Sequence, residues 1–141
     1  MSDDPLYRRD LLRLAADAVG AGQLAEPDAV GAAHNPVCGD RVHVELSIRS
    51  GRIAALAHSS QACVMVQASA AILAEEAIGL DRGDLAALAS AIQAMLRGEG
   101  PPPSPVSVVF AGVAAHPNRH SCVLLPIEAA LTALENTEPG A

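Results

Sequence analysis

The sequence predicts an α+β fold, a small three-stranded antiparallel sheet with four to five helices packed on it. Apolar residues recur at helical spacing near the start, alternate with polar residues over residues 42–48, and return to helical spacing after residue 60. This order of helix, strands and helices is typical of the α+β class. We expect one domain over residues 1–141, because a chain of 141 residues can enclose one hydrophobic core but not two.

A capping signal and an apolar stripe predict the first helix. Asp4 can accept hydrogen bonds from free amides at a helix start, and Pro5 suits the first helical position. Leu11 and Leu14 follow at helical spacing, and Gly20 ends the run. The pattern therefore predicts a helix that stops before Gly20.

The sheet is predicted from three consecutive segments. Residues 42–48 carry Val, Val, Leu and Ile at every second position, which is the period of a half-buried strand. Ser50 and Gly51 form a turn, so residues 52–58 are expected to return as the hairpin partner. Residues 21–33 are small and rich in glycine, which fits a loop and a short edge strand.

Helical patterns occupy the rest of the chain. Ser60 is expected to cap a helix over residues 61–78, and a short helix or a strand could occupy residues 106–113. Residues 123–134 predict a terminal helix, which should start late or kink because Pro126 lacks a backbone N–H. The remaining helix has an apolar face made of Leu85, Leu88, Ala89, Ile92, Met95 and Leu96.

Composition excludes several classes of function. The net charge is −7, from 16 acidic residues and 9 arginines, and there are only two aromatic residues. This balance argues against binding to nucleic acid or to an anionic membrane surface. The sequence also lacks a membrane-spanning apolar run and a signal-peptide core, so we expect a cytoplasmic protein. Three cysteines in that compartment favour metal or thiol chemistry over disulfides.

The segment Asn-Pro-Val-Cys-Gly-Asp at residues 35–40 is the first candidate site. Cys38 and Asp40 are two residues apart, so in extended backbone a thiol and a carboxylate point to the same side. Gly39 between them permits a tight turn or the close approach of a ligand. The same residues also suit an ordinary turn, and the segment alone does not decide between the two.

The other two cysteines lie in separate elements. Cys63 is expected at about the third position of its helix, where free amides and the helix dipole favour a thiolate. It could be a metal ligand, a nucleophile or a small buried residue. Cys122 lies near the start of the last helical segment. The separations of 25 and 59 residues do not match a paired zinc knuckle, so spacing alone is weak evidence for a metal.

Three motifs, in order, resemble a known family. They are Asn-Pro-x-Cys-Gly-Asp at residues 35–40, Ala-Cys followed by Gln-Ala-Ser-Ala between residues 62 and 70, and Arg119-x-x-Cys122. The chain is similar over nearly its whole length to the IscU/SufU family, related to the N-terminal domain of NifU. The segment that leads into Cys122 more closely resembles the SufU branch.

The resemblance implies an iron–sulfur cluster assembly scaffold. Cys38, Asp40, Cys63 and Cys122 would then bind iron, zinc or a transient [2Fe–2S] or [4Fe–4S] cluster. Three thiolates and a carboxylate suit a four-coordinate site, and an oxygen ligand would make one position labile. His120 is a reserve fourth ligand if Asp40 does not bind.

The SufU-like alternative is a zinc-dependent sulfur acceptor, or sulfurtransferase partner, of a cysteine desulfurase. Cys122 would accept persulfide sulfur, assisted by Arg119. In either case the implied partners are a SufS- or IscS-like desulfurase and cluster-accepting apoproteins, and the protein would be a monomer or a weak homo-oligomer. We expect a scaffold or acceptor rather than an enzyme. Two other hypotheses remain open, a thiol enzyme with Cys63 as nucleophile and a family member with a purely structural zinc.

Overall fold

The structure is a computed structural model that describes residues 9–36, 39–104, 110, 113 and 115–136. The helices and strands in chain order are α1 (Arg9–Asp17), β1 (Ala29–His34), β2 (Arg41–Arg49), β3 (Arg52–Gln61), α2 (Val64–Glu76), α3 (Arg82–Leu96), the 3-10 helix η3 (Pro117–Arg119) and α4 (His120–Glu135). The predicted fold class is confirmed. The expected capping pair Asp4–Pro5 and most of the expected segment at residues 106–113 lie outside the described residues. Among the helices that are described, none has the length and apolar character needed to cross a membrane.

The three strands form an antiparallel sheet in the order β1-β2-β3. The alternation predicted for β2 is confirmed, because Val42, Val44 and Leu46 are all buried on one face. The hairpin partner is longer than predicted, since Ser60 and Gln61 still pair with β2. The expected helix start at Ser60 is therefore wrong, and α2 begins at Val64.

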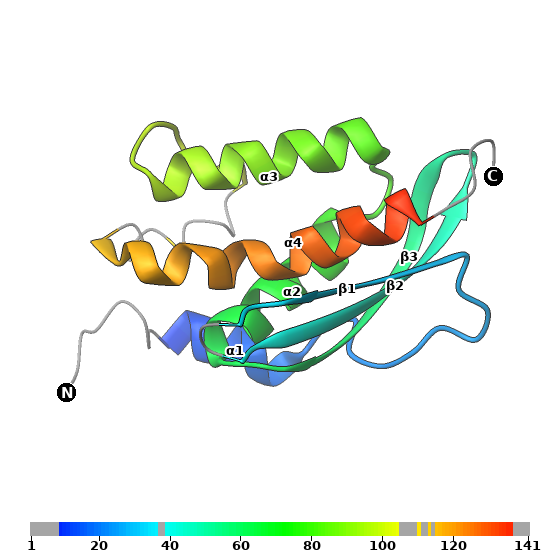
Figure 1. Ribbon diagram of the computed structural model, residues 1–141, viewed down its shortest axis with the longest axis horizontal. Coiled ribbons are helices and arrows are strands. Elements are labelled where there is room, and N and C mark those ends of the chain that lie inside the picture. Colours follow the sequence, from blue (N-terminus) through cyan, green and yellow to red (C-terminus); the bar gives the residue numbers. More distant parts are fainter. Residues whose placement is uncertain (1–8, 37–38, 105–109, 111–112, 114, 137–141) are drawn as a thin grey trace.

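In Figure 1, α3 and α4 lie above the strands, α2 lies between α4 and the strands, and α1 lies at the lower left. α4 packs on β1 and β2, α2 packs on β3 and on α4, α3 packs on α4, and α1 packs on α2. Apart from Phe110, the largest fully buried side chains are aliphatic, as the composition requires. The inner face of the sheet and the helices on it enclose one hydrophobic core.

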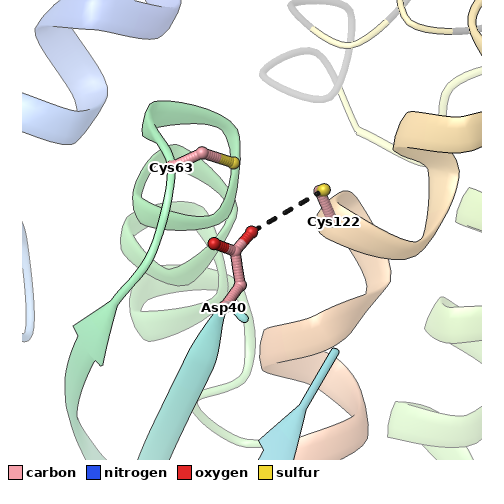
Figure 2. A group of neighbouring side chains, drawn as sticks. All are labelled: Asp40, Cys63 and Cys122. Atoms are coloured by element: carbon pink, nitrogen blue, oxygen red, sulfur yellow. Dashed lines mark hydrogen bonds between the residues drawn. The ribbon is translucent and has the colours of Figure 1, made fainter. Parts of the chain in front are cut away.

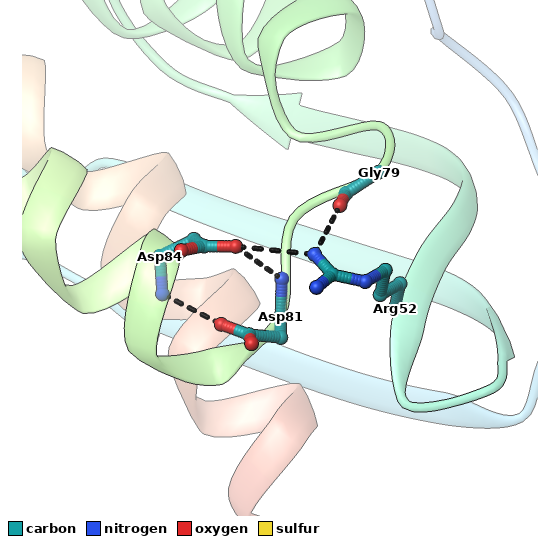
Figure 3. Close-up of polar contacts among 4 residues, drawn as sticks. All are labelled: Arg52, Gly79, Asp81 and Asp84. Carbon is teal, nitrogen blue, oxygen red and sulfur yellow. Dashed lines mark hydrogen bonds and ion pairs between the residues drawn. The ribbon is translucent and has the colours of Figure 1, made fainter.

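A capping box begins α3 at a position that the sequence patterns did not reveal. The Asp81 carboxylate accepts the Asp84 N–H at 2.8 Å, and the Asp84 carboxylate accepts the Asp81 N–H at 3.2 Å. Arg52, at the start of β3, donates to Gly79 O at 3.0 Å and to Asp84 at 3.3 Å (Figure 3). These contacts fix the connection between α2 and α3 against the hairpin.

Gly31 lets α4 approach β1 more closely than any other residue would. A Cβ atom at this position would lie 2.8 Å from Ala133 Cα, and closer still to Ala129 O and Ala133 N. These are backbone atoms, so no side-chain rotation could relieve the contact. The close approach determines where α4 lies over the sheet.

We expect Gly31→Ala to lower the free energy of unfolding by about 1–3 kcal/mol, the usual cost of forcing an extra methyl group into a packed interior. Gly83→Ala in α3 is the matched control. Its Cβ would meet only Asp81 Oδ1 at 3.5 Å, so helix propensity should stabilise that variant by up to about 1 kcal/mol. Urea unfolding of both variants measures the difference, and equal stabilities would contradict the close approach.

Candidate metal centre

The loop between β1 and β2 presents Asp40 to the helices. The Asn35 N–H donates to Asp40 O, and the Gly39 N–H donates to Asn35 O, both at 2.8 Å. Gly39 has a φ of +76°, a left-handed conformation that glycine adopts without strain. Asp40 is only 7% exposed, which is unusual for a carboxylate. Cys38 belongs to the same loop and lies outside the described residues.

Cys63 is the N-cap residue of α2, with extended backbone at φ −68° and ψ 166°. It therefore precedes the helix instead of occupying the predicted third position, because β3 continues to Gln61. The N-cap position still faces the free amides and the positive end of the helix dipole. The physical reason for expecting a stabilised thiolate at Cys63 is unchanged.

Cys122 is the third residue of α4 and is 1% exposed. The expectation that this helix starts late is wrong, because α4 begins at His120 and continues through Pro126. Burial of the residues around the proline outweighs the loss of one helical hydrogen bond. The Ser69 hydroxyl of α2 also donates to Val123 O at 2.5 Å, which links the two helices beside Cys122.

Asp40, Cys63 and Cys122 meet at one point (Figure 2). One ligand atom from each lies within 4.8 Å of the others, and Cys122 Sγ is 3.9 Å from Asp40 Oδ2. The three residues come from a strand-connecting loop, a helix N-cap and the first turn of another helix. Two thiols and a carboxylate are a donor set that suits zinc or an iron–sulfur cluster.

The pKa of Cys63 is lowered from its ordinary value of 9.0 to about 6. The largest cause is the hydrogen bond from the Cys122 side chain, and the Val66 and Met65 amides act in the same direction. Partial burial and the negative charge of Asp40 oppose the shift. The sulfur makes no regular capping hydrogen bond, so we attribute the amide effect to their partial positive charges.

In metal-free protein at pH 7, we expect iodoacetamide to modify Cys63 faster than Cys122. Cys63 is half-buried and mostly ionised at that pH, whereas Cys122 is buried. The rate at Cys63 should fall as the pH drops through about 6, because the thiol is then protonated. Cleavage after arginine places Cys38, Cys63 and Cys122 in different peptides, so mass spectrometry can follow each cysteine. Faster modification of Cys122 would contradict the arrangement.

The other residues singled out from the sequence have different positions. Arg119 ends η3, and His120 begins α4, three and two residues before Cys122. Within the described part of the chain, the group of converging ligands does not include His120, which favours Asp40. His58 has a structural contact instead, because its buried ring Nε2 lies 2.7 Å from Val19 O.

Some residues around the site were not assigned a role from the sequence. Gln67 donates to Ala62 O at 2.8 Å, beside the N-cap Cys63. Asn35 donates to Ser121 Oγ at 3.0 Å. Gln67 and Asn35 belong to the quoted motifs, so the signal was present, but the partners of these side chains depend on the fold.

Fold and site together define a class, a small α+β domain that brings thiols and a carboxylate to one point where a metal ion could bind. The chain belongs to the family described as NifU-like N terminal domain, whose model matches residues 6–122. The resemblance inferred from the sequence is therefore confirmed at the level of the family.

Three known proteins illustrate the relationship. A crystal structure of a nitrogen-fixing NifU-like protein (N-terminal) from Brucella abortus is 33% identical, with a TM-score of 0.86 over 98% of both chains. The iron–sulfur cluster assembly scaffold protein IscU of Streptococcus pyogenes serotype M1 is 28% identical over 119 residues, 82% of this chain and 74% of that protein. A protein from Fervidobacterium islandicum AW-1, described as a scaffold for the SUF system, has a TM-score of 0.85 at 22% identity, over 94% of this chain and 99% of its own. That last likeness shows a shared fold, with which the SufU branch is compatible.

Proposed function

We propose that this protein is an iron–sulfur cluster assembly scaffold that holds iron, zinc or a nascent cluster through Cys38, Asp40, Cys63 and Cys122. The observation that carries the proposal is the convergence of Asp40, Cys63 and Cys122 within 4.8 Å. The description of the Streptococcus pyogenes relative as a cluster assembly scaffold supports it. Cys38 supplies the fourth ligand in this proposal, from the loop that also carries Asp40.

The chemistry of the four ligands suits a cargo that must be given away. Thiolates hold zinc and iron–sulfur clusters firmly, and a carboxylate oxygen binds a cluster iron less firmly than a fourth thiolate does. Asp40 would then be the labile ligand. As a scaffold, the protein would work with a cysteine desulfurase that supplies sulfur and with apoproteins that accept the finished cluster.

A zinc-dependent sulfur acceptor is the second candidate. The half-buried Cys63 thiol with its lowered pKa favours it, because a thiolate can attack a persulfide. In such a step, the sulfane sulfur of the desulfurase persulfide bonds to the acceptor thiolate and the donor thiolate leaves. The resemblance to the SufU branch implies Cys122, assisted by Arg119, as the acceptor. Because Cys122 is buried, the site would have to open for that reaction.

Anaerobic reconstitution with ferrous iron, cysteine, a cysteine desulfurase and a thiol reductant, which reduces the delivered sulfur to sulfide, separates the two candidates. A scaffold should acquire the visible absorption of an iron–sulfur cluster and pass it to an apoprotein. A sulfur acceptor should instead accelerate desulfurase turnover without forming a cluster. Alkylation followed by peptide mapping would identify whether Cys63 or Cys122 carries the extra sulfur. If neither a cluster nor faster desulfurase turnover is observed, both candidates are contradicted.

The two remaining hypotheses differ in their response to metal removal. A thiol enzyme that uses Cys63 as nucleophile should keep its activity in a chelator, although His58, the nearest histidine in the sequence, contacts Val19 O instead. A structural zinc should affect unfolding, while cluster formation and desulfurase turnover stay unaffected.

A further inference from the structure

A hydrogen bond between residues that are not ligands joins the two sides of the candidate metal centre. Asn35 Nδ2 donates to Ser121 Oγ at 3.0 Å, across 86 residues of sequence. Asn35 begins the loop that carries Asp40, and Ser121 immediately precedes Cys122 on α4. The bond therefore connects the same two segments as the contact between Asp40 and Cys122.

Asn35 is also the residue on which the loop closes. Its N–H donates to Asp40 O, and its carbonyl accepts the Gly39 N–H, both at 2.8 Å. Its side chain then extends the same set of bonds to α4. A movement of Ser121 away from Asn35 would thus separate the Asp40 loop from the helix that carries Cys122.

Other contacts between α4 and the sheet lie further from the centre. Gly31 meets the backbone of Ala129 and Ala133, about two and three turns beyond Cys122, and Asn136 donates to Val30 O at 3.0 Å near the end of α4. These contacts fix the middle and the end of α4. The thiol of Cys122 is 3.9 Å from Asp40, which is a weak contact.

We propose that Asn35 and Ser121 are positioning residues, a polar clasp that holds the Asp40 loop against the start of α4 and slows the release of bound metal. The proposal rests on the proposed metal centre. Neither residue needs to touch the metal. The clasp acts by keeping Asp40 and Cys122 at the spacing that a single ion requires.

The test measures zinc release from the full chain to an excess of a coloured chelator. Asn35→Ala and Ser121→Ala should each speed release about twofold, which corresponds to about 0.5 kcal/mol, because this hydrogen bond is exposed to solvent. The double variant should release zinc more slowly than the product of the two single effects predicts, because each single variant already removes the shared bond. Ser121→Thr keeps the hydroxyl and should restore slow release. Asn118→Ala, an exposed asparagine in η3, is the matched control and should behave as wild type.

Two outcomes would overturn the clasp, and they are distinct from failure of the centre itself. Release at the wild-type rate from both alanine variants, or additive effects in the double variant, would contradict it although zinc still binds. If wild-type protein binds no zinc, the proposed centre fails instead. In that case hydrogen exchange of the Gly39 amide in metal-free protein decides: Ser121→Ala should speed it severalfold, and unchanged exchange would refute the clasp.

Discussion

Cys122→Ser should abolish retention of zinc by the purified protein. Zinc sites in small folded peptides bind with about 10–16 kcal/mol, so an equal share for one of four ligands is roughly 3 kcal/mol, or more than a hundredfold in Kd. The serine hydroxyl is a poor substitute for a thiolate at a zinc ion. Metal analysis after gel filtration measures the effect, and Cys38→Ser should give the same loss.

Loss of zinc from the Cys122→Ser variant has to be distinguished from unfolding of the variant. Cys122 is buried with its sulfur 3.9 Å from Asp40, and a serine of similar size should fit the same space. Circular dichroism should therefore show a folded protein without zinc. Ser59→Ala on the exposed face of β3 is the control and should keep its zinc. Full zinc occupancy in Cys122→Ser would exclude this cysteine as a ligand.

Asp40→Ala should make a bound cluster more persistent and slow its transfer to an apoprotein by roughly tenfold, the factor set by about 1.4 kcal/mol of barrier. The reason is that the carboxylate is the ligand through which the cluster exchanges in the proposed function. Transfer can be followed by the absorption of the acceptor protein after reconstitution of each variant.

The control for Asp40→Ala removes a carboxylate elsewhere. Glu26 is an exposed acidic residue in the loop before β1, and Glu26→Ala should transfer its cluster as wild type does. Unchanged transfer of the cluster in Asp40→Ala would show that Asp40 is a buried residue of the turn and has no role in cluster exchange. Faster loss of the cluster would make it a firm ligand instead of a labile one.

The parts of the fold that depend on local periodicity were predictable from the sequence. The alternation in β2 and the apolar face of α3 both correspond to observed elements, because side-chain period follows backbone geometry directly. Element ends were less predictable. Ser60 looked like a helix cap, but its pairing with Val42 extends β3, and such pairing depends on a distant strand.

The candidate site also combines features that the sequence predicts with features that depend on distant contacts. Sequence motifs brought Asp40, Cys63 and Cys122 into one hypothesis, and the structure brings their ligand atoms together. Spacing along the sequence could not predict this convergence, because the distances among the three side chains depend on how α2 and α4 pack against the sheet. The start of α4 was predicted too late, because Pro126 was expected to delay or kink a helix over residues 123–134, whereas burial of its neighbours outweighs the low helix propensity of proline. The bond between Asn35 and Ser121 connects residues that no local pattern relates.

The most direct test of the shared centre is metal content measured together with thiol accessibility. Protein purified without chelators should carry about one zinc ion per chain, with its three cysteines protected from a thiol reagent until the metal is removed. Addition of a chelator should make the cysteines reactive, with Cys63 modified before the buried Cys122. Protein that carries no metal and has three freely titratable thiols in its native state would contradict the centre.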